Sequence, residues 1–491
     1  MKEYFLEIFK INPKEINELY GIRAIGCYIV IAYHCFVNGL GFMNQEYKDL
    51  HPKFQNFEML MDLFFVISSF LISYSFSNEL KKHNFLKSWK NFFLKRSLRI
   101  FPPLYILLAF SIIIMGFTIQ AAKQGANLGV MNSGIPELEA KLNHWWADVF
   151  YISNYFPLRM LIHGWSLSME EQFYLAMPVF FLCYNFLIQS KKYKIITLLC
   201  LMLLPIAIRI YYFLTVPLDN NEIYLQKVFH PIHTHFDSFI AGILLMEIFK
   251  ITEEKKNKSK FKFIFFIIFS VTFIFYLISF TFSFEQTRFY QVVLRISLYA
   301  LLSFLIVLGT IQGYFSYLKR ILANILLVFI GKLSYGIYLV HLYVSGFVMI
   351  KVYSYNDISS NDSISVLKSS FYTLLLSAFI ALISYYFVEK PFLKIREWSQ
   401  PKFNIHTQTF YFIPVSRTEL KIVSWILTAL SILPFYFFKQ FMKNEFVPKS
   451  TVTVTILILL LAIPLLLNLY TLVSRRSLFF TFFFDKKTRE V

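Results

Sequence analysis

The chain has 491 residues, of which 57% are hydrophobic and 20% aromatic. Soluble domains contain about 45–50% apolar residues and rarely carry repeated apolar stretches of about 20 residues, so a soluble globular protein is excluded. The formal charge is +19, but the basic residues lie in short loops between apolar segments, which favours a lipid bilayer over nucleic acid as the partner.

The lengths of the apolar runs predict about twelve membrane-spanning helices, and hence an all-α, polytopic transmembrane bundle. The helices begin near residues 22, 58, 98, 170, 194, 234, 262, 290, 322, 368, 420 and 451. Alternate loops carry about 33 and about 11 Lys and Arg, which predicts that both termini are cytoplasmic. We expect a ten-span core over residues 1–395, a cytoplasmic linker over 396–417, an additional helix pair over 418–475 and a basic cytoplasmic tail over 476–491.

The first span contains two ionisable residues, Arg23 at its cytoplasmic start and His34 eleven residues later. Eleven helical steps return to within about 20° of the same face with a rise of about 16 Å, so both side chains should line one side of the span. A neutral imidazole there can accept a proton from an alcohol. The alternative is an arginine that extends to the membrane surface and a histidine bonded to a neighbouring helix.

The third span opens with Arg96 and Arg99, followed by Pro102 and Pro103. The i, i+3 spacing places both guanidinium groups on one face at the cytoplasmic surface, where they could bind phosphate. The two prolines are expected to break the regular helix. The alternative for the arginines is ordinary positive flanking of a span.

The fourth span opens with Trp165, Glu170 and Glu171 after the largest outer loop. Adjacent carboxylates project about 100° apart on a helix, so only one should face a given cavity, where it could act as an acid, a base or a hydrogen-bond acceptor. The alternative is that both acids complement the dipole at the helix N-terminus.

Other polar residues at the ends or within spans are Asp62, Asp237, His341 and Glu389. An ionisable residue in a span is costly and is a functional candidate by default. The pair His233 and His235 invites a metal site, but no span supplies an obvious acidic third ligand. The four cysteines also lack metal-binding spacing, so we expect no metal.

Seven segments, in this order, resemble the membrane-bound acyltransferase-3 family over roughly residues 16–395. They are ELYGIRAIGCYIVIAYH, MDLFFVISSFLIS, RSLRIFPPLY, WSLSMEEQFYL, HFDSFIAGILL, LSYGIYLVHL and VEKPF. One departure is visible, because the family's second span usually reads Ser-Gly where this chain has Ser68 and Ser69. A missing glycine leaves less room for a close helix contact at this point.

The resemblance implies roles for individual residues. His34 corresponds to the catalytic histidine, and Arg23 and Glu170 to further catalytic residues. Arg96 and Arg99 correspond to residues that contact the phosphates of coenzyme A. Residues implied to bind the substrate are Asp62, Trp165, Tyr335 and His341.

By the same resemblance we expect an O-acyltransferase with no permanently bound cofactor. Its donor would be cytoplasmic acetyl-coenzyme A or another acyl-coenzyme A, and its acceptor a hydroxyl of a cell-surface or lipid-linked saccharide. Abundant Phe, Ile, Lys and Asn indicate an A·T-rich genome, which favours a bacterial inner membrane. The alternative is a transporter or flippase for a saccharide or lipid, whose buried charges would form a translocation path. The sequence shows no internal repeat of the kind that many transporters have.

Overall fold

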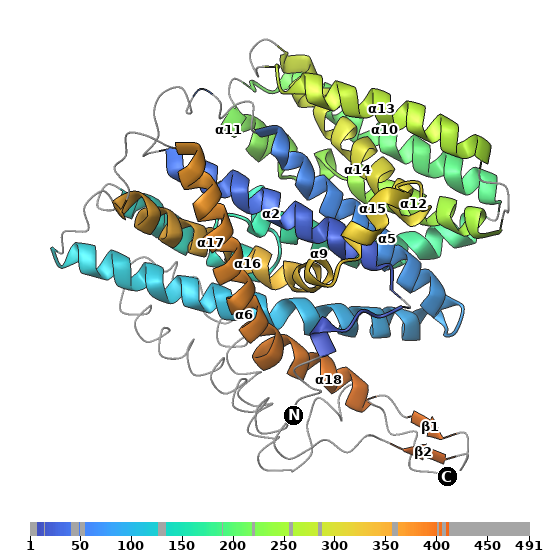
Figure 1. Ribbon diagram of the computed structural model, residues 1–491, viewed down its shortest axis with the longest axis horizontal. Helices are drawn as coiled ribbons and strands as arrows, with labels where there is room; N and C mark the ends of the chain where they lie inside the picture. Colours follow the sequence, from blue (N-terminus) through green and yellow to red (C-terminus); the bar gives the residue numbers. More distant parts are fainter. Residues whose placement is uncertain are drawn as a thin grey trace. The chain divides into compact units, whose positions relative to one another are not determined.

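The computed structural model describes residues 7–13, 15–40, 49, 55–125, 134–188, 190–218, 221–254, 259–282, 287–355, 362–399, 402–404 and 409–411. The chain divides into two compact units, most of whose helices and strands are labelled in Figure 1. The first comprises residues 1–90, 150–157 and 163–382, and the second comprises residues 91–149, 158–162 and 383–491.

The first unit is a helical bundle. Its long helices are α2 (Asn17–Gly39), α5 (Met59–Leu80), α9 (Gly164–Leu187), α10 (Lys191–Thr215), α12 (Asp237–Glu254), α13 (Ser259–Ser279), α14 (Arg295–Ile311), α16 (Ile325–Tyr355) and most of α17 (Asp362–Ser384). Short elements join them: η1 (Glu7–Phe9), η3 (Gln55–Glu58), η5 (Ser153–Tyr155), α11 (Asn221–Tyr224), η6 (Leu225–Phe229), η7 (Ile232–Thr234), η8 (Tyr290–Leu294) and α15 (Ser316–Leu322).

The second unit contains most of α6 (Phe85–Lys123), with α7 (Ile135–Asn143), α8 (Trp145–Val149), η9 (Tyr385–Glu389) and α18 (Lys390–Ser399). A two-stranded antiparallel hairpin, β1 (Lys402–Asn404) and β2 (Thr409–Tyr411), lies within the predicted linker. Helix α6 runs without interruption through Pro102 and Pro103, so the predicted break was wrong. Prolines are tolerated in membrane helices where neighbouring groups satisfy the freed carbonyls.

Eight helices are long and apolar enough to cross a membrane among the described residues. Helices α9 and α12 occupy the fourth and sixth predicted positions but are not among these eight, so the predicted number of ten core spans stays a prediction. The all-α, polytopic membrane fold is therefore confirmed. The predicted spans near residues 420 and 451, and the tail, lie outside the described residues.

Helices α2 and α16 run in the same direction with their backbones in direct contact. A Cβ added to Gly331 of α16 would lie 2.0 Å from the Tyr20 carbonyl oxygen of α2, and one added to Gly21 would lie 2.0 Å from the Leu322 carbonyl oxygen of α15. Only glycine fits at such a distance, as in other close-packed membrane helices. These contacts fix the beginning of α2 against both neighbours.

Helices α5 and α12 make a second close contact. A Cβ on Gly242 of α12 would lie 1.7 Å from the Ser69 hydroxyl and 2.6 Å from the Val66 carbonyl oxygen of α5. The small residue that this crossing needs is therefore supplied by α12. Ser69 is completely buried and its hydroxyl donates to the Val66 carbonyl at 3.3 Å, so the serine at this position is accommodated.

A buried ion pair joins α10, α12 and α14. Arg209 donates to both carboxylate oxygens of Asp237, at 2.8 and 2.9 Å, and also to Ser297 at 2.7 Å. Its remaining donors reach the carbonyl oxygens of Val293 and Thr234. A buried charge is tolerated when it is paired and fully hydrogen-bonded, so Asp237 has a structural partner that sequence analysis did not identify.

Candidate active site

His34 lies on the face of α2 that packs against α16. Its ring centroid is 5.2 Å from that of His341, and farther along the two helices the Asn38 side chain donates to the Ser345 hydroxyl at 2.8 Å. His34 is partly buried, whereas His341 is 1% exposed. The structure therefore brings together two predicted site residues, of which His34 is the more exposed.

A third histidine completes the group. The ring of His163, the residue that precedes α9, lies 5.7 Å from that of His341. We call His34, His163 and His341 the histidine cluster, because two helices, α2 and α16, and the turn before α9 bring their rings together. Sequence analysis missed His163. It lies two residues before Trp165, the first residue of the quoted fourth-span segment, and this position could have indicated it.

Tyr338 of α16 links His341 to His163 in the histidine cluster. Its carbonyl oxygen accepts a 2.6 Å hydrogen bond from Nδ1 of His341, while its hydroxyl donates to the His163 carbonyl oxygen at 3.1 Å. The Ser166 hydroxyl lies 2.5 Å from the Tyr338 hydroxyl and 3.1 Å from the same His163 carbonyl oxygen. The beginning of α9 is thus bonded directly to the turn of α16 that carries His341.

The environment of His163 favours an uncharged ring. Burial holds the pKa of His163 well below its usual range, and the neighbouring His341 and His34 lower it further, against a smaller opposite effect of the Leu339 carbonyl. A neutral imidazole offers one donor and one acceptor.

Within the described residues, no group of three or more His, Cys, Asp or Glu side chains is arranged to hold a metal ion.

Trp165 lies in the first turn of α9, two residues after His163, and packs within a group of aromatic rings. Its ring centroid lies 4.6 Å from His230, 5.2 Å from Phe229 and 6.2 Å from Phe65. These contacts give the partly buried indole a packing role. Its predicted contact with the substrate stays a prediction.

Glu170 lies at the end of a chain of two hydroxyl groups. Tyr174 donates to its carboxylate at 3.0 Å, and the Ser68 hydroxyl of α5 lies 2.6 Å from the Tyr174 hydroxyl. Because Tyr174 donates to Glu170, Ser68 donates to Tyr174. The adjacent Glu171 is 5% exposed, whereas Glu170 is partly buried, so the two carboxylates have different surroundings.

Asp62 forms an ion pair with His235, which lies between η7 and α12. Its Oδ1 lies 2.8 Å from Nε2 of His235 and accepts a 2.5 Å hydrogen bond from Ser238. Nδ1 of His235 faces the Phe229 carbonyl oxygen at 2.6 Å. Both ring nitrogens therefore face acceptors, which requires two ring protons. Burial lowers the pKa of His235, but the Asp62 carboxylate, the Phe229 carbonyl and the Asp237 carboxylate together outweigh burial, so the net pKa is raised.

The remaining predicted residues occupy the expected helices. Arg23 is partly buried on α2, and Tyr335 is partly buried on α16, six residues before His341. In the second unit, Arg96 and Arg99 are both partly buried on α6, and the Arg99 guanidinium interacts electrostatically with the buried Glu389 carboxylate. The predicted binding of phosphate by this arginine pair stays a prediction.

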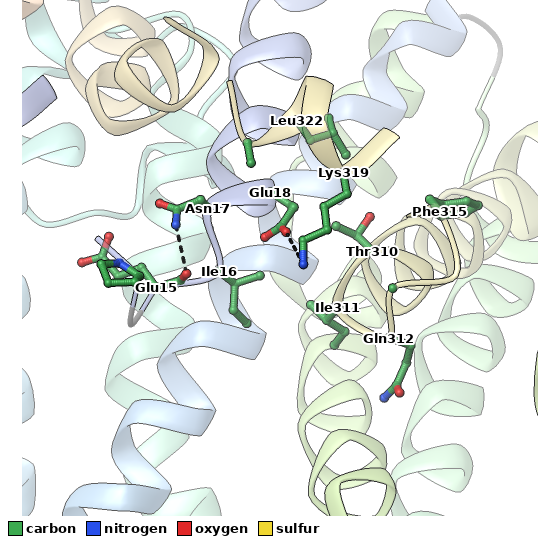
Figure 2. Close-up of a pocket in the computed structure, with 13 residues that line it drawn as sticks. Glu15, Ile16, Asn17, Glu18, Thr310, Ile311, Gln312, Phe315, Lys319 and Leu322 are labelled. Carbon is green, nitrogen blue, oxygen red and sulfur yellow. Dashed lines mark hydrogen bonds and ion pairs between the residues drawn. The ribbon is translucent and has the colours of Figure 1, made fainter. Parts of the chain in front are cut away.

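A pocket of about 570 Å³ opens in the first unit between the start of α2, the end of α14 and α15 (Figure 2). Its size would accommodate a small ligand. Its charged lining consists of Glu15, Glu18 and Lys319, and Lys319 pairs with Glu18 at 3.7 Å. Two carboxylates against one ammonium group make the pocket a poor match for the phosphates of coenzyme A.

Residues 16–389 match the profile of the acyltransferase-3 family, described as an acyltransferase domain. The chain belongs to this family. The match extends from the segment before α2 to the end of η9 and therefore contains the whole histidine cluster and both arginines of α6. No solved structure matches the chain.

Curated relatives carry acetyltransferase names. A Staphylococcus aureus (strain COL) protein named "Putative O-acetyltransferase" is 27% identical over 400 residues, which cover 77% of this chain and 57% of the relative. A Staphylococcus aureus (strain NCTC 8325 / PS 47) protein named "O-acetyltransferase OatA" is 28% identical over 264 residues, which cover 51% of this chain and 37% of the relative. The chain thus spans little more than half the length of the first of these relatives and well under half the length of the second.

Proposed function

We propose that the chain is an integral membrane O-acetyltransferase that moves an acetyl group from acetyl-coenzyme A to a hydroxyl of a cell-surface or lipid-linked saccharide. The histidine cluster is the observation that carries this proposal, because it places a partly accessible imidazole among the helices of a chain from an acyltransferase family. The names of the relatives support acetyl as the group transferred and oxygen as the acceptor atom.

In the proposed reaction, His34 acts as general base. It removes the proton of the acceptor hydroxyl as the oxygen attacks the thioester carbonyl carbon, and an oxyanion forms. The carbon–sulfur bond then breaks, coenzyme A leaves as the thiolate, and His34 returns the proton to the sulfur. A histidine base typically contributes about 100- to 10,000-fold to the rate.

The donor and the acceptor would meet the protein at different places. Positive loops favour a cytoplasmic position for Arg96 and Arg99, where guanidinium groups would bind the phosphates of the cytoplasmic donor. Trp165 and Glu170 lie beyond the largest predicted outer loop and would meet the saccharide, whose faces suit an indole ring. We propose the same orientation for the whole chain, with both termini in the cytoplasm of a bacterial cell.

The decisive experiment compares purified wild-type protein with His34→Ala. The assay follows the release of coenzyme A thiol from acetyl-coenzyme A, with mass spectrometry of the acceptor for the added acetyl group. We expect the variant to insert and fold normally and to lose at least about 100-fold in turnover. Cys200→Ser, an exposed change on α10, serves as the control with unaltered turnover. Full acetyl transfer by a folded His34→Ala protein would refute the proposal.

A separate variant tests the donor site. Replacing both Arg96 and Arg99 by alanine should raise the KM for acetyl-coenzyme A much more than it lowers kcat, because phosphate contacts bind the ground state and the transition state alike. An unchanged KM would assign the phosphates to other residues.

A further inference from the structure

The hydrogen bonding of His341 determines which of its ring nitrogens can accept. Nδ1 faces the Tyr338 carbonyl oxygen at 2.6 Å, and a carbonyl oxygen only accepts, so Nδ1 carries a hydrogen atom. In a neutral ring the other nitrogen, Nε2, then has a lone pair. Nε2 is buried and has no hydrogen-bond partner among the described residues. A buried acceptor left in this state costs about 1–3 kcal/mol, so a partner is expected when the site is working.

Two rings lie close enough to provide that partner. The ring of His34 is 5.2 Å from that of His341 and the ring of His163 is 5.7 Å away, centroid to centroid. Catalytic hydrogen bonds are often open in a protein without substrate and close when the substrate binds. His34 is the nearer ring, and it is partly exposed whereas His163 is buried, so His34 has more room to turn toward Nε2.

We infer that His341 is the positioning residue of His34. The Tyr338 carbonyl holds the Nδ1–H of His341, so that Nε2 of His341 accepts an N–H of His34. This inference rests on the proposed function. A neutral histidine has one N–H, and once Nε2 of His341 accepts it the opposite nitrogen of His34 carries the lone pair that takes the substrate's proton. In serine hydrolases a carboxylate performs this orienting task, and here an imidazole anchored to a backbone carbonyl performs it.

The same contact helps after the proton has moved. When His34 holds two protons, its N–H toward Nε2 becomes a charge-assisted donor, and such hydrogen bonds are roughly twice as strong as neutral ones. His341 therefore stabilises the intermediate in which the proton rests on His34. This role differs from the substrate-binding role that the sequence implied for His341, since it acts on kcat and leaves substrate affinity largely unchanged.

Two substitutions of equal polarity separate the two nitrogens of His341. The amide oxygen of glutamine reaches the position of Nε2, whereas the amide of asparagine reaches only the position of Nδ1. His341→Gln keeps an acceptor for His34, and His341→Asn keeps a donor for the Tyr338 carbonyl alone. We expect His341→Asn to lower kcat about 100-fold and His341→Gln to stay within about 10-fold of wild type, with little change in either KM.

The outcomes are distinct. If His341→Asn and His341→Gln both fold and have equal kcat values, whether high or low, the positioning role is overturned. His341 would then serve only to pack against the ring of His163. A large rise in the acceptor KM with unchanged kcat would also overturn it and return His341 to substrate binding. Turnover that is insensitive to His34→Ala refutes the proposed function itself, whereas His34-dependent turnover with no difference between asparagine and glutamine refutes only this inference.

Discussion

Replacing Gly331 by alanine tests whether the contact between α2 and α16 sets the geometry of the histidine cluster. The new Cβ would lie 2.0 Å from the Tyr20 carbonyl oxygen, and real Cβ atoms essentially never approach within 3.0 Å. The two backbones must therefore separate by roughly 1 Å at this point. Overpacking of this kind costs about 1–3 kcal/mol, and a displacement of 1 Å at a catalytic group costs about 100-fold in rate.

The matched control is Gly346→Ala on the same helix, where an added Cβ meets no atom within 4 Å. Alanine is the better helix former by roughly 0.5–1 kcal/mol, so this variant should be as stable as wild type or slightly more stable. Thermal unfolding in detergent measures stability, and release of coenzyme A thiol measures turnover. We expect Gly331→Ala to lower both. If it unfolds and turns over as the control does, the close contact has no bearing on the site.

Three further outcomes are expected. Asp237→Asn should destabilise the folded protein by about 3–5 kcal/mol because it leaves Arg209 buried and uncompensated, as equilibrium unfolding in denaturant would show. Gly242→Ala should lower the unfolding temperature, and adding Ser69→Gly should restore only part of it, because backbone atoms of α5 also lie within 3 Å of the new Cβ. The folded-state pKa of His235 is raised, so the stabilisation from its protonated ring is full below about pH 6.5 and is lost as the pH rises through the folded-state pKa. In His235→Gln the unfolding temperature should therefore depend less on pH in that range.

The bundle could be predicted from sequence because membrane spans have a strong signal. Each needs about 20 apolar residues, and such runs stand out along the sequence, with Lys and Arg concentrated in alternate loops. The break at Pro102 and Pro103 was mispredicted because the rule that proline ends a helix comes from proteins in water, and in a membrane bundle other groups can satisfy the freed carbonyls.

The site could be predicted only in part. His34 and His341 were both identified as polar residues in spans, but the sequence does not state that α2 and α16 are neighbours. His163 lies in a loop, where a histidine is unremarkable until tertiary packing buries it. Arg209 was missed for a related reason, because its partner Asp237 is distant in sequence and the pair could be matched only once α10 and α12 were seen together.

The attachment of α2 to α16 bears on how a substrate would reach His34 in the proposed reaction. One end of the pair is fixed by Gly331 against Tyr20 and the other by the hydrogen bond from Asn38 to Ser345, with His34 between them. A rocking movement of these two helices would disrupt both attachments at once. We therefore expect the two helices to move as one body, so that under the proposed function an opening that admits a substrate to His34 would form at other helices.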